Sequence, residues 1–406
     1  MLLGIRNTIP WERDKVSSPV ETVPAPTAAN TKSAVRSERL GFIDWTRGAA
    51  TLVMLQGHVW ESFTHKDLRD TGVYMMSQFP GGVAPAVFLF LSGVTLAFLI
   101  DSREQKGAGA WSRFNAALRR AAFLGSLAIL FRLQMWAFYW PNSPWKDLLR
   151  VDILNCMAAA CIMLAPVATF GRLGRIRGAM LVSGIIAFGA PFMSDWKADA
   201  PESLMRMYLA PDYGAFALFP WGTFVAFGMV CGTVFRCVSE EGRENLMQWA
   251  GWAGFALAFT GQYISNLPYN IYPHTEFWLD SPCLTFIKLG VILMVAAFGY
   301  FWNLWIPRVR EGAGAGPRFS IPRQLGQTSL LIYWFHIELV YGRWANPFKG
   351  KTPLFETALY ALGVIALMLA LSVGKTRLVA SKWYLDRRAE ILGRLPFLTQ
   401  KQPDSA

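Results

Sequence analysis

One apolar segment with charged residues along one side most constrains how this chain can fold. Residues 39–63 read RLGFIDWTRGAATLVMLQGHVWESF, which predicts a membrane helix. Arg47 and His58 are separated by about three helical turns and about 16 Å, so they share a face at different depths. Asp44 lies on that face too, one turn before Arg47. Because charged groups in a bilayer normally face a protein interior or a wet cavity, we interpret this face as the wall of an active site.

The composition is that of a membrane protein. Hydrophobic residues make up 53% of the chain and charged residues only 16%, with several apolar runs of about twenty residues, the length that crosses a bilayer. We therefore predict an all-α polytopic membrane protein. The predicted helices lie at about 42–62, 83–101, 120–139, 151–170, 177–193, 214–235, 248–266, 282–302, 325–341 and 354–374.

The charge pattern gives these helices an orientation. The formal net charge of +12 would point to nucleic acid in a soluble protein, but here the basic residues collect on one side. Of the 39 Lys and Arg residues, 27 fall in the segments on the amino-terminal side of the membrane and nine in the opposite loops. The positive-inside rule places both termini in the cytoplasm. It also places Arg47 near the cytoplasmic end of its helix and His58 toward the outer half, and we expect no nucleic-acid partner.

Three parts are expected along the chain. Residues 1–38 are polar and proline-bearing and predict a disordered cytoplasmic leader without a cleavable signal peptide. Residues 39–375 hold the membrane domain. Residues 376–406 predict a basic amphipathic tail that lies along the inner membrane surface.

Metal and nucleotide signatures are missing from the sequence. The four histidines and five cysteines form no pair at metal-binding spacing. The glycine-rich stretch at about 310–316 follows no strand, so a flexible loop explains it better than a nucleotide-binding turn. We expect no metal cofactor.

Several arginines are candidates for binding a phosphorylated ligand. Arg113, Arg119 and Arg120 follow the second predicted helix, and Arg132 lies inside the third. Guanidinium groups bind phosphate through paired hydrogen bonds. The first three could equally be charges that only set the topology.

Polar residues in later helices allow two interpretations each. Asp152 and Asn155 either line an acceptor pocket or cap a helix, and His336 either contributes to the site or belongs to an interfacial anchor. Lys288 needs a buried partner, for which Asp280 is the candidate. The small residues Gly93, Gly228 and Gly232 are interpreted as positions where helices pack closely.

Four stretches resemble known membrane acyltransferases. FIDWTRGAATLVMLQGH resembles the D-x-x-R-G opening of the transmembrane acyltransferase superfamily, and its Arg47 and His58 match the R-x10-H motif of the acyltransferase-3 branch. APAVFLFLSGVTLAF is similar to the second-helix signature of the heparan-alpha-glucosaminide N-acetyltransferase catalytic-domain family and its bacterial relatives. FPWGTFVAFGMVCG and LGQTSLLIYWFH resemble that family's later helices. The resemblance covers roughly residues 39–341.

This resemblance implies transfer of an acyl group from cytoplasmic acetyl-CoA, or another acyl-CoA, to a hydroxyl or amine of a glycan or small-molecule acceptor at the outer face. It gives His58 the role of general base or acyl carrier, with Arg47 and Asp44 beside it. In the animal lysosomal branch, however, the position of His58 is usually Asn and the proposed catalytic histidine follows in the next loop. His65 is therefore a rival for the catalytic role. The short chain favours a bacterial inner-membrane protein.

Other functions fit the same residues. Asp44, Arg47, His58 and Lys288 would also suit a secondary transporter, although no inverted repeat is visible in the sequence. Arg47 and Asp44 could be a purely structural pair, and His58 a packed histidine bonded to a backbone carbonyl. A non-catalytic scaffold fits the buried charges least well. The sequence leaves the oligomeric state open, with a homodimer as one option.

Overall fold

The computed structural model describes residues 28–141, 143–199, 203–312 and 319–381. Within these ranges every regular element is a helix, and only two isolated β-bridges occur. The α-helices are α1 (Ala28–Phe63), α2 (Gly72–Gly81), α3 (Ala84–Gln105), α4 (Ala110–Phe138), α5 (Ile153–Leu164), α6 (Arg172–Asp199), α7 (Leu204–Leu209), α8 (Leu218–Cys237), α9 (Arg243–Ser265), α10 (Pro282–Gly312), α11 (Ile321–Gln327), α12 (Ser329–Tyr341) and α13 (Leu354–Ala380). Short 3₁₀ helices cover Lys66–Leu68 (η1), Trp145–Leu149 (η2), Val167–Thr169 (η3) and Arg343–Ala345 (η4).

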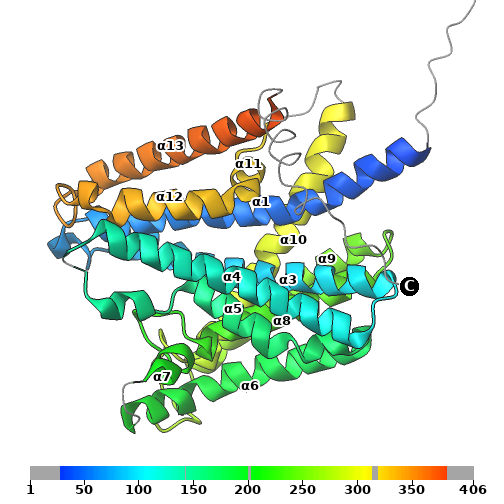
Figure 1. The fold of residues 1–406 in the computed structure, drawn as a ribbon, viewed down its shortest axis with the longest axis horizontal. Coiled ribbons are helices and arrows are strands. Elements are labelled where there is room, and N and C mark those ends of the chain that lie inside the picture. Colours follow the sequence, from blue (N-terminus) through cyan, green and yellow to red (C-terminus); the bar gives the residue numbers. More distant parts are fainter. Residues whose placement is uncertain (1–27, 142, 200–202, 313–318, 382–406) are drawn as a thin grey trace, which may run out of the picture.

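Helix α1 joins two groups of helices. It contacts α3 and α10 in one group and α11, α12 and α13 in the other, and Figure 1 shows α13 on the opposite side of α1 from α3, α5, α6 and α8. Its first membrane turns, including Phe42 and Ile43, belong to the larger apolar core. Its later turns, including Leu55 and Val59, belong to a separate core with α11–α13. The polar face of α1 therefore lies where the two groups meet.

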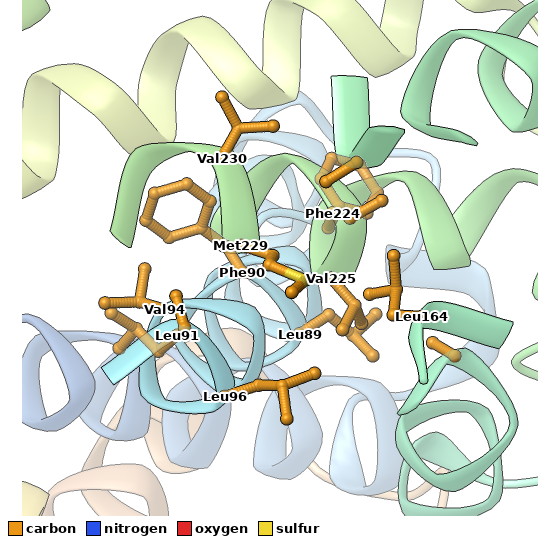
Figure 2. Packing of buried hydrophobic residues seen from close by; sticks show 14 of the residues in the cluster. Leu89, Phe90, Leu91, Val94, Leu96, Leu164, Phe224, Val225, Met229 and Val230 are labelled. Atoms are coloured by element: carbon orange, nitrogen blue, oxygen red, sulfur yellow. The ribbon is translucent and has the colours of Figure 1, made fainter. Parts of the chain in front are cut away.

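Small residues allow α3 and α8 to pack backbone against backbone. A Cβ atom at Gly93 would lie 1.9 Å from the Val225 carbonyl oxygen, and one at Gly228 would lie 2.0 Å from that of Phe90. Around this contact, side chains of α3 and α8 interdigitate (Figure 2). The interpretation of Gly93, Gly228 and Gly232 as packing positions is confirmed.

Buried ion pairs hold the ends of three helices together. Asp101 on α3 is fully buried and accepts hydrogen bonds from Arg172 of α6 at 2.7 Å and Arg236 of α8 at 2.8 Å. Glu104, one turn later, accepts from the buried Arg175 of α6 at 2.5 Å. Several basic residues that the sequence assigned only to topology thus bind the bundle together.

The prediction of a polytopic membrane protein is confirmed, but ten full spans are not. All ten predicted segments contain a helix, and six helical segments of the described residues are long and apolar enough to cross a membrane, namely Gly72–Gln105, Ala110–Phe138, Arg172–Lys197, Leu218–Cys237, Pro282–Arg310 and Leu354–Ala380. α5 and α12 are apolar but shorter. Asp152 begins α5, and a break at Thr328 divides the predicted segment 325–341 into α11 and α12. α1 and α9 do not reach the hydropathy of the six.

Three further expectations differ from the structure or lie outside it. The last part of the predicted leader, residues 28–38, is the start of α1. The described ranges leave out residues 1–27, 313–318 and 382–406. These residues include most of the predicted leader, most of the glycine-rich loop and most of the predicted tail. The Lys288 ammonium lies 4.8 Å from the centre of the Trp221 ring, whereas Asp280 accepts from Thr275 and Glu276. The prediction that Asp280 is the partner of Lys288 was wrong.

A glycine-to-alanine pair tests the close packing of α1. A Cβ at Gly48 would lie 1.6 Å from the Pro322 carbonyl oxygen at the start of α11, whereas one at Gly363 of α13 meets no atom within 4 Å. We expect Gly48→Ala to destabilise the protein by about 1–3 kcal/mol through overpacking. Gly363→Ala should be neutral or slightly stabilising, because alanine favours helix. Thermal unfolding in detergent measures both, and equal melting temperatures would contradict the packing.

Candidate active site

A cavity of about 820 Å³ lies where the two groups of helices meet. α1 contributes Arg47, Met54, His58 and Glu61 to its wall. α3, α4 and α5 line it from one side, and the α11–α12 junction, α12 and α13 from the other. Of the three residues on the predicted polar face of α1, Arg47 and His58 line the cavity, whereas Asp44 pairs with Arg47 and does not line it. The cavity explains how the charge of Arg47 persists on this helix.

Three cations gather toward one end of the cavity. Arg47 donates to Asp44 across 3.1 Å, and Arg120 of α4 donates to the Thr95 hydroxyl of α3 at 2.7 Å. Lys375 is the residue of α13 that lines the cavity. α13 lies near this end because the Gln324 side chain of α11 donates to its Ser372 and Thr376 hydroxyls. α11 in turn packs on α1 beside Asp44. The charge pattern of the sequence assigns this end to the cytoplasm.

His58 lies farther along the same wall, and its ring is held from behind. Its Nδ1 is 3.3 Å from Nε2 of His336, whose own Nδ1 is 2.8 Å from the Ile332 carbonyl oxygen. His336 is fully buried and does not line the cavity. The Tyr341 ring packs edge-on against His58 at 5.5 Å. Among the described residues the Nε2 atom of His58 has no hydrogen-bond partner, so it is free to meet a ligand.

An ion pair between α4 and α5 forms another part of the wall. Arg132 Nε lies 3.2 Å from Asp152 Oδ2, and both residues line the cavity. The other oxygen of Asp152 accepts the backbone N–H groups of Leu154 and Asn155. Asp152 is thus both a helix cap and a cavity residue, which were the two interpretations open from sequence. Asn155 does not line the cavity; it accepts from the Tyr208 hydroxyl at 3.2 Å.

Aromatic residues and Asp212 line another part of the cavity wall, which we call the rim. Tyr213, Trp221 and Trp278 lie there with Asp212, and Arg150 of the wall donates to the Gly214 carbonyl beside them. Lys197 donates to Asp212 at 2.5 Å and holds the pKa of that carboxyl below its usual range, so Asp212 stays ionised at neutral pH.

Besides Asp44, Asn155 and His336, three more of the predicted site residues do not line the cavity. Arg113 donates to the Ala168 and Thr169 carbonyls and so caps η3, while Arg119 is exposed. His65 is about half exposed, begins η1 and pairs with Asp67 at 3.4 Å. None of the three lines the cavity. Of the four arginines predicted to bind phosphate, only Arg120 and Arg132 reach it.

A comparison with family models supplies the identification. The model of the heparan-alpha-glucosaminide N-acetyltransferase catalytic domain matches residues 39–272, more than half of the chain. The chain belongs to this family. A search of curated proteins gave no match. Family membership implies acetyltransferase activity with acetyl-CoA as donor, and the six long apolar helical segments make this protein a multi-pass membrane member.

The matched range of this acetyltransferase family member includes Arg47, His58, Arg120 and Asp152 but ends before α10. His336, Tyr341 and Lys375 lie beyond it, and the fold brings all three to the cavity or directly behind it.

Three residues that line the cavity, Glu61, Tyr341 and Lys375, were not predicted from the sequence. Glu61 is one turn after His58 on the same helical face, a spacing that could have identified it. It accepts a hydrogen bond from the Tyr341 hydroxyl. Nothing local marked Tyr341 or Lys375, because α12 and α13 reach the site only through the tertiary fold.

The Arg132–Asp152 pair of this acetyltransferase can be tested by removing one charge. Asp152→Asn keeps a good helix cap but leaves the Arg132 guanidinium without its counter-ion. We expect a loss of up to about 3–5 kcal/mol in the free energy of unfolding. The double variant Arg132→Met/Asp152→Asn should recover much of this loss. Thermal unfolding of both in detergent is the measurement, and a double variant less stable than Asp152→Asn would refute the coupling.

Proposed function

We propose that this protein transfers an acetyl group from cytoplasmic acetyl-CoA to an amine or hydroxyl of a glycan-like acceptor at the outer face of a bacterial inner membrane. The observation that carries the proposal is that the wall of one cavity holds His58, several cations and the aromatic rim with Asp212. Donor and acceptor can then meet at His58 without the acetyl group leaving the protein.

The cationic end suits coenzyme A. Its phosphates need several cations, and guanidinium and ammonium groups form strong charge-assisted hydrogen bonds to phosphate. Arg47, Arg120 and Lys375 offer such groups on three different helices. The thioester would then extend along the cavity toward His58.

His58 supplies the proton transfer. In our proposal its Nε2 accepts a proton from the acceptor amine or hydroxyl, whose lone pair attacks the thioester carbonyl. A C–N or C–O bond forms, the C–S bond breaks, and His58 returns the proton to the departing thiolate. The alternative is that His58 attacks first and carries the acetyl group as an acyl-histidine. The shared cavity favours direct transfer.

The aromatic rim with its Asp212 carboxylate suits a sugar-like acceptor. The aromatic rings of Trp221, Trp278 and Tyr213 can cover the apolar faces of a sugar, and the ionised Asp212 can accept hydrogen bonds from hydroxyl or ammonium groups. The transporter alternative uses the same wall, but the family match favours an enzyme.

Histidine substitutions test the catalytic assignment. Purified protein in detergent is given radiolabelled acetyl-CoA and a panel of amino sugars, and acetylated product is quantified. We expect His58→Ala to lower kcat by about 10²–10⁴-fold, the usual contribution of a general base, and His65→Ala to retain wild-type activity. Acetyl label that stays on the wild-type protein and is lost in His58→Ala would favour the acyl-histidine route. Loss of activity only in His65→Ala would move the catalytic role to the loop.

Charge removal tests the donor end. We expect Arg120→Gln and Lys375→Gln each to weaken acetyl-CoA binding by about tenfold or more, the value of one charge-assisted contact. Arg119→Gln is the matched control, because Arg119 is on the same helix as Arg120 but is exposed and does not line the cavity. Calorimetry measures the dissociation constants. Equal affinities for the three variants would place the phosphates elsewhere.

A further inference from the structure

We infer that His336 is a positioning residue that holds His58 in the one tautomer able to act as a base toward the cavity. The inference rests on the proposed function, in which His58 Nε2 accepts the proton of the acceptor. It adds a role to a residue of α12 that does not line the cavity but contacts His58 from behind.

The Ile332 carbonyl oxygen determines which nitrogen of each histidine ring carries a hydrogen. A carbonyl oxygen can only accept, so Nδ1 of His336, 2.8 Å from the Ile332 oxygen, must carry the hydrogen. A neutral imidazole has one N–H group, so Nε2 of His336 is then an acceptor. His58 Nδ1, 3.3 Å away, must donate to it. The lone pair of His58 is therefore on Nε2.

The neutral state of His336 follows from its surroundings. The ring is fully buried, and among the described residues no carboxylate pairs with it. A buried charge without a partner would be costly. If His336 carried hydrogens on both nitrogens, His58 Nδ1 would have to accept, and His58 would present an N–H to the cavity and lose its function as a base.

Packing holds the two rings in this arrangement. The ring centres of His58 and His336 are 5.1 Å apart, and the Tyr333 ring lies edge-on to His336 at 5.9 Å. Tyr341 covers His58 at 5.5 Å. Such a second layer of hydrogen bonding commonly fixes the tautomer and direction of a working histidine, a task more often given to a carboxylate. Here a backbone carbonyl and a second histidine share it.

Two substitutions separate positioning from packing. In His336→Gln the side-chain oxygen can still accept from His58 Nδ1 and the amide nitrogen can still donate to Ile332. His336→Leu fills a similar volume but removes both contacts. We expect His336→Leu to lower kcat by about 10–100-fold, with the KM for acetyl-CoA unchanged, and His336→Gln to restore most of kcat. His336→Met provides a second apolar variant if His336→Leu does not fold.

A background variant completes the test. In His58→Ala the loss caused by His336→Leu should disappear, because a residue that acts only through His58 adds nothing once His58 is gone. Wild-type kcat in the folded apolar variants, or a Gln variant as impaired as the Leu variant, would overturn the positioning role. A fully active His58→Ala single variant would instead refute the proposed function, so the two failures are distinguishable.

Discussion

Hydrocarbon cannot solvate the polar groups of α1, and this constraint shapes the rest of the protein. A helix that carries Asp44, Arg47, His58 and Glu61 within about five turns can persist in a bilayer only if that face is enclosed. The fold encloses it between two groups of helices, each with its own apolar core, and α1 contributes to both cores. The cavity is thus the consequence of the charges on α1.

Close backbone contact then fixes where these groups lie. α11 packs against α1 at Gly48 with no room for a side chain, and α3 and α8 approach in the same way at Gly93. Buried ion pairs centred on Asp101 tie the ends of α3, α6 and α8 together. These rigid contacts hold the cationic end, His58 and the rim of the cavity in one frame, as a site that must align two substrates requires.

The sequence predicted what depends on local pattern and missed what depends on tertiary contact. Helical periodicity placed Arg47 and His58 on one wall of the cavity, although Asp44 of the same face does not line it. Small residues marked the α3–α8 packing. Hydropathy identified the helices but overestimated the number that cross the membrane in full. One reason is the break at Thr328, which divides a predicted segment and does not change its hydropathy. The basic segment after α3 gave three arginine candidates and the next predicted helix a fourth, yet Arg113 is used by a local cap. The His58–His336 contact and the position of Lys375 at the cavity bring together residues far apart in sequence. No local sequence pattern predicts such contacts.

Cysteine labelling tests most directly whether water-soluble ligands enter the cavity as deep as Thr95. Thr95 of α3 and Thr233 of α8 each donate to the carbonyl four residues earlier, but only Thr95 lines the cavity. In a background without the five native cysteines, Thr95→Cys and Thr233→Cys would be treated with an anionic, membrane-impermeant thiol reagent. We expect the reagent to label Thr95→Cys, acetyl-CoA to slow that labelling, and Thr233→Cys to stay unlabelled until the protein is denatured. An unreactive Thr95→Cys in folded protein, or labelling that acetyl-CoA leaves unchanged, would contradict a ligand-accessible cavity at this site.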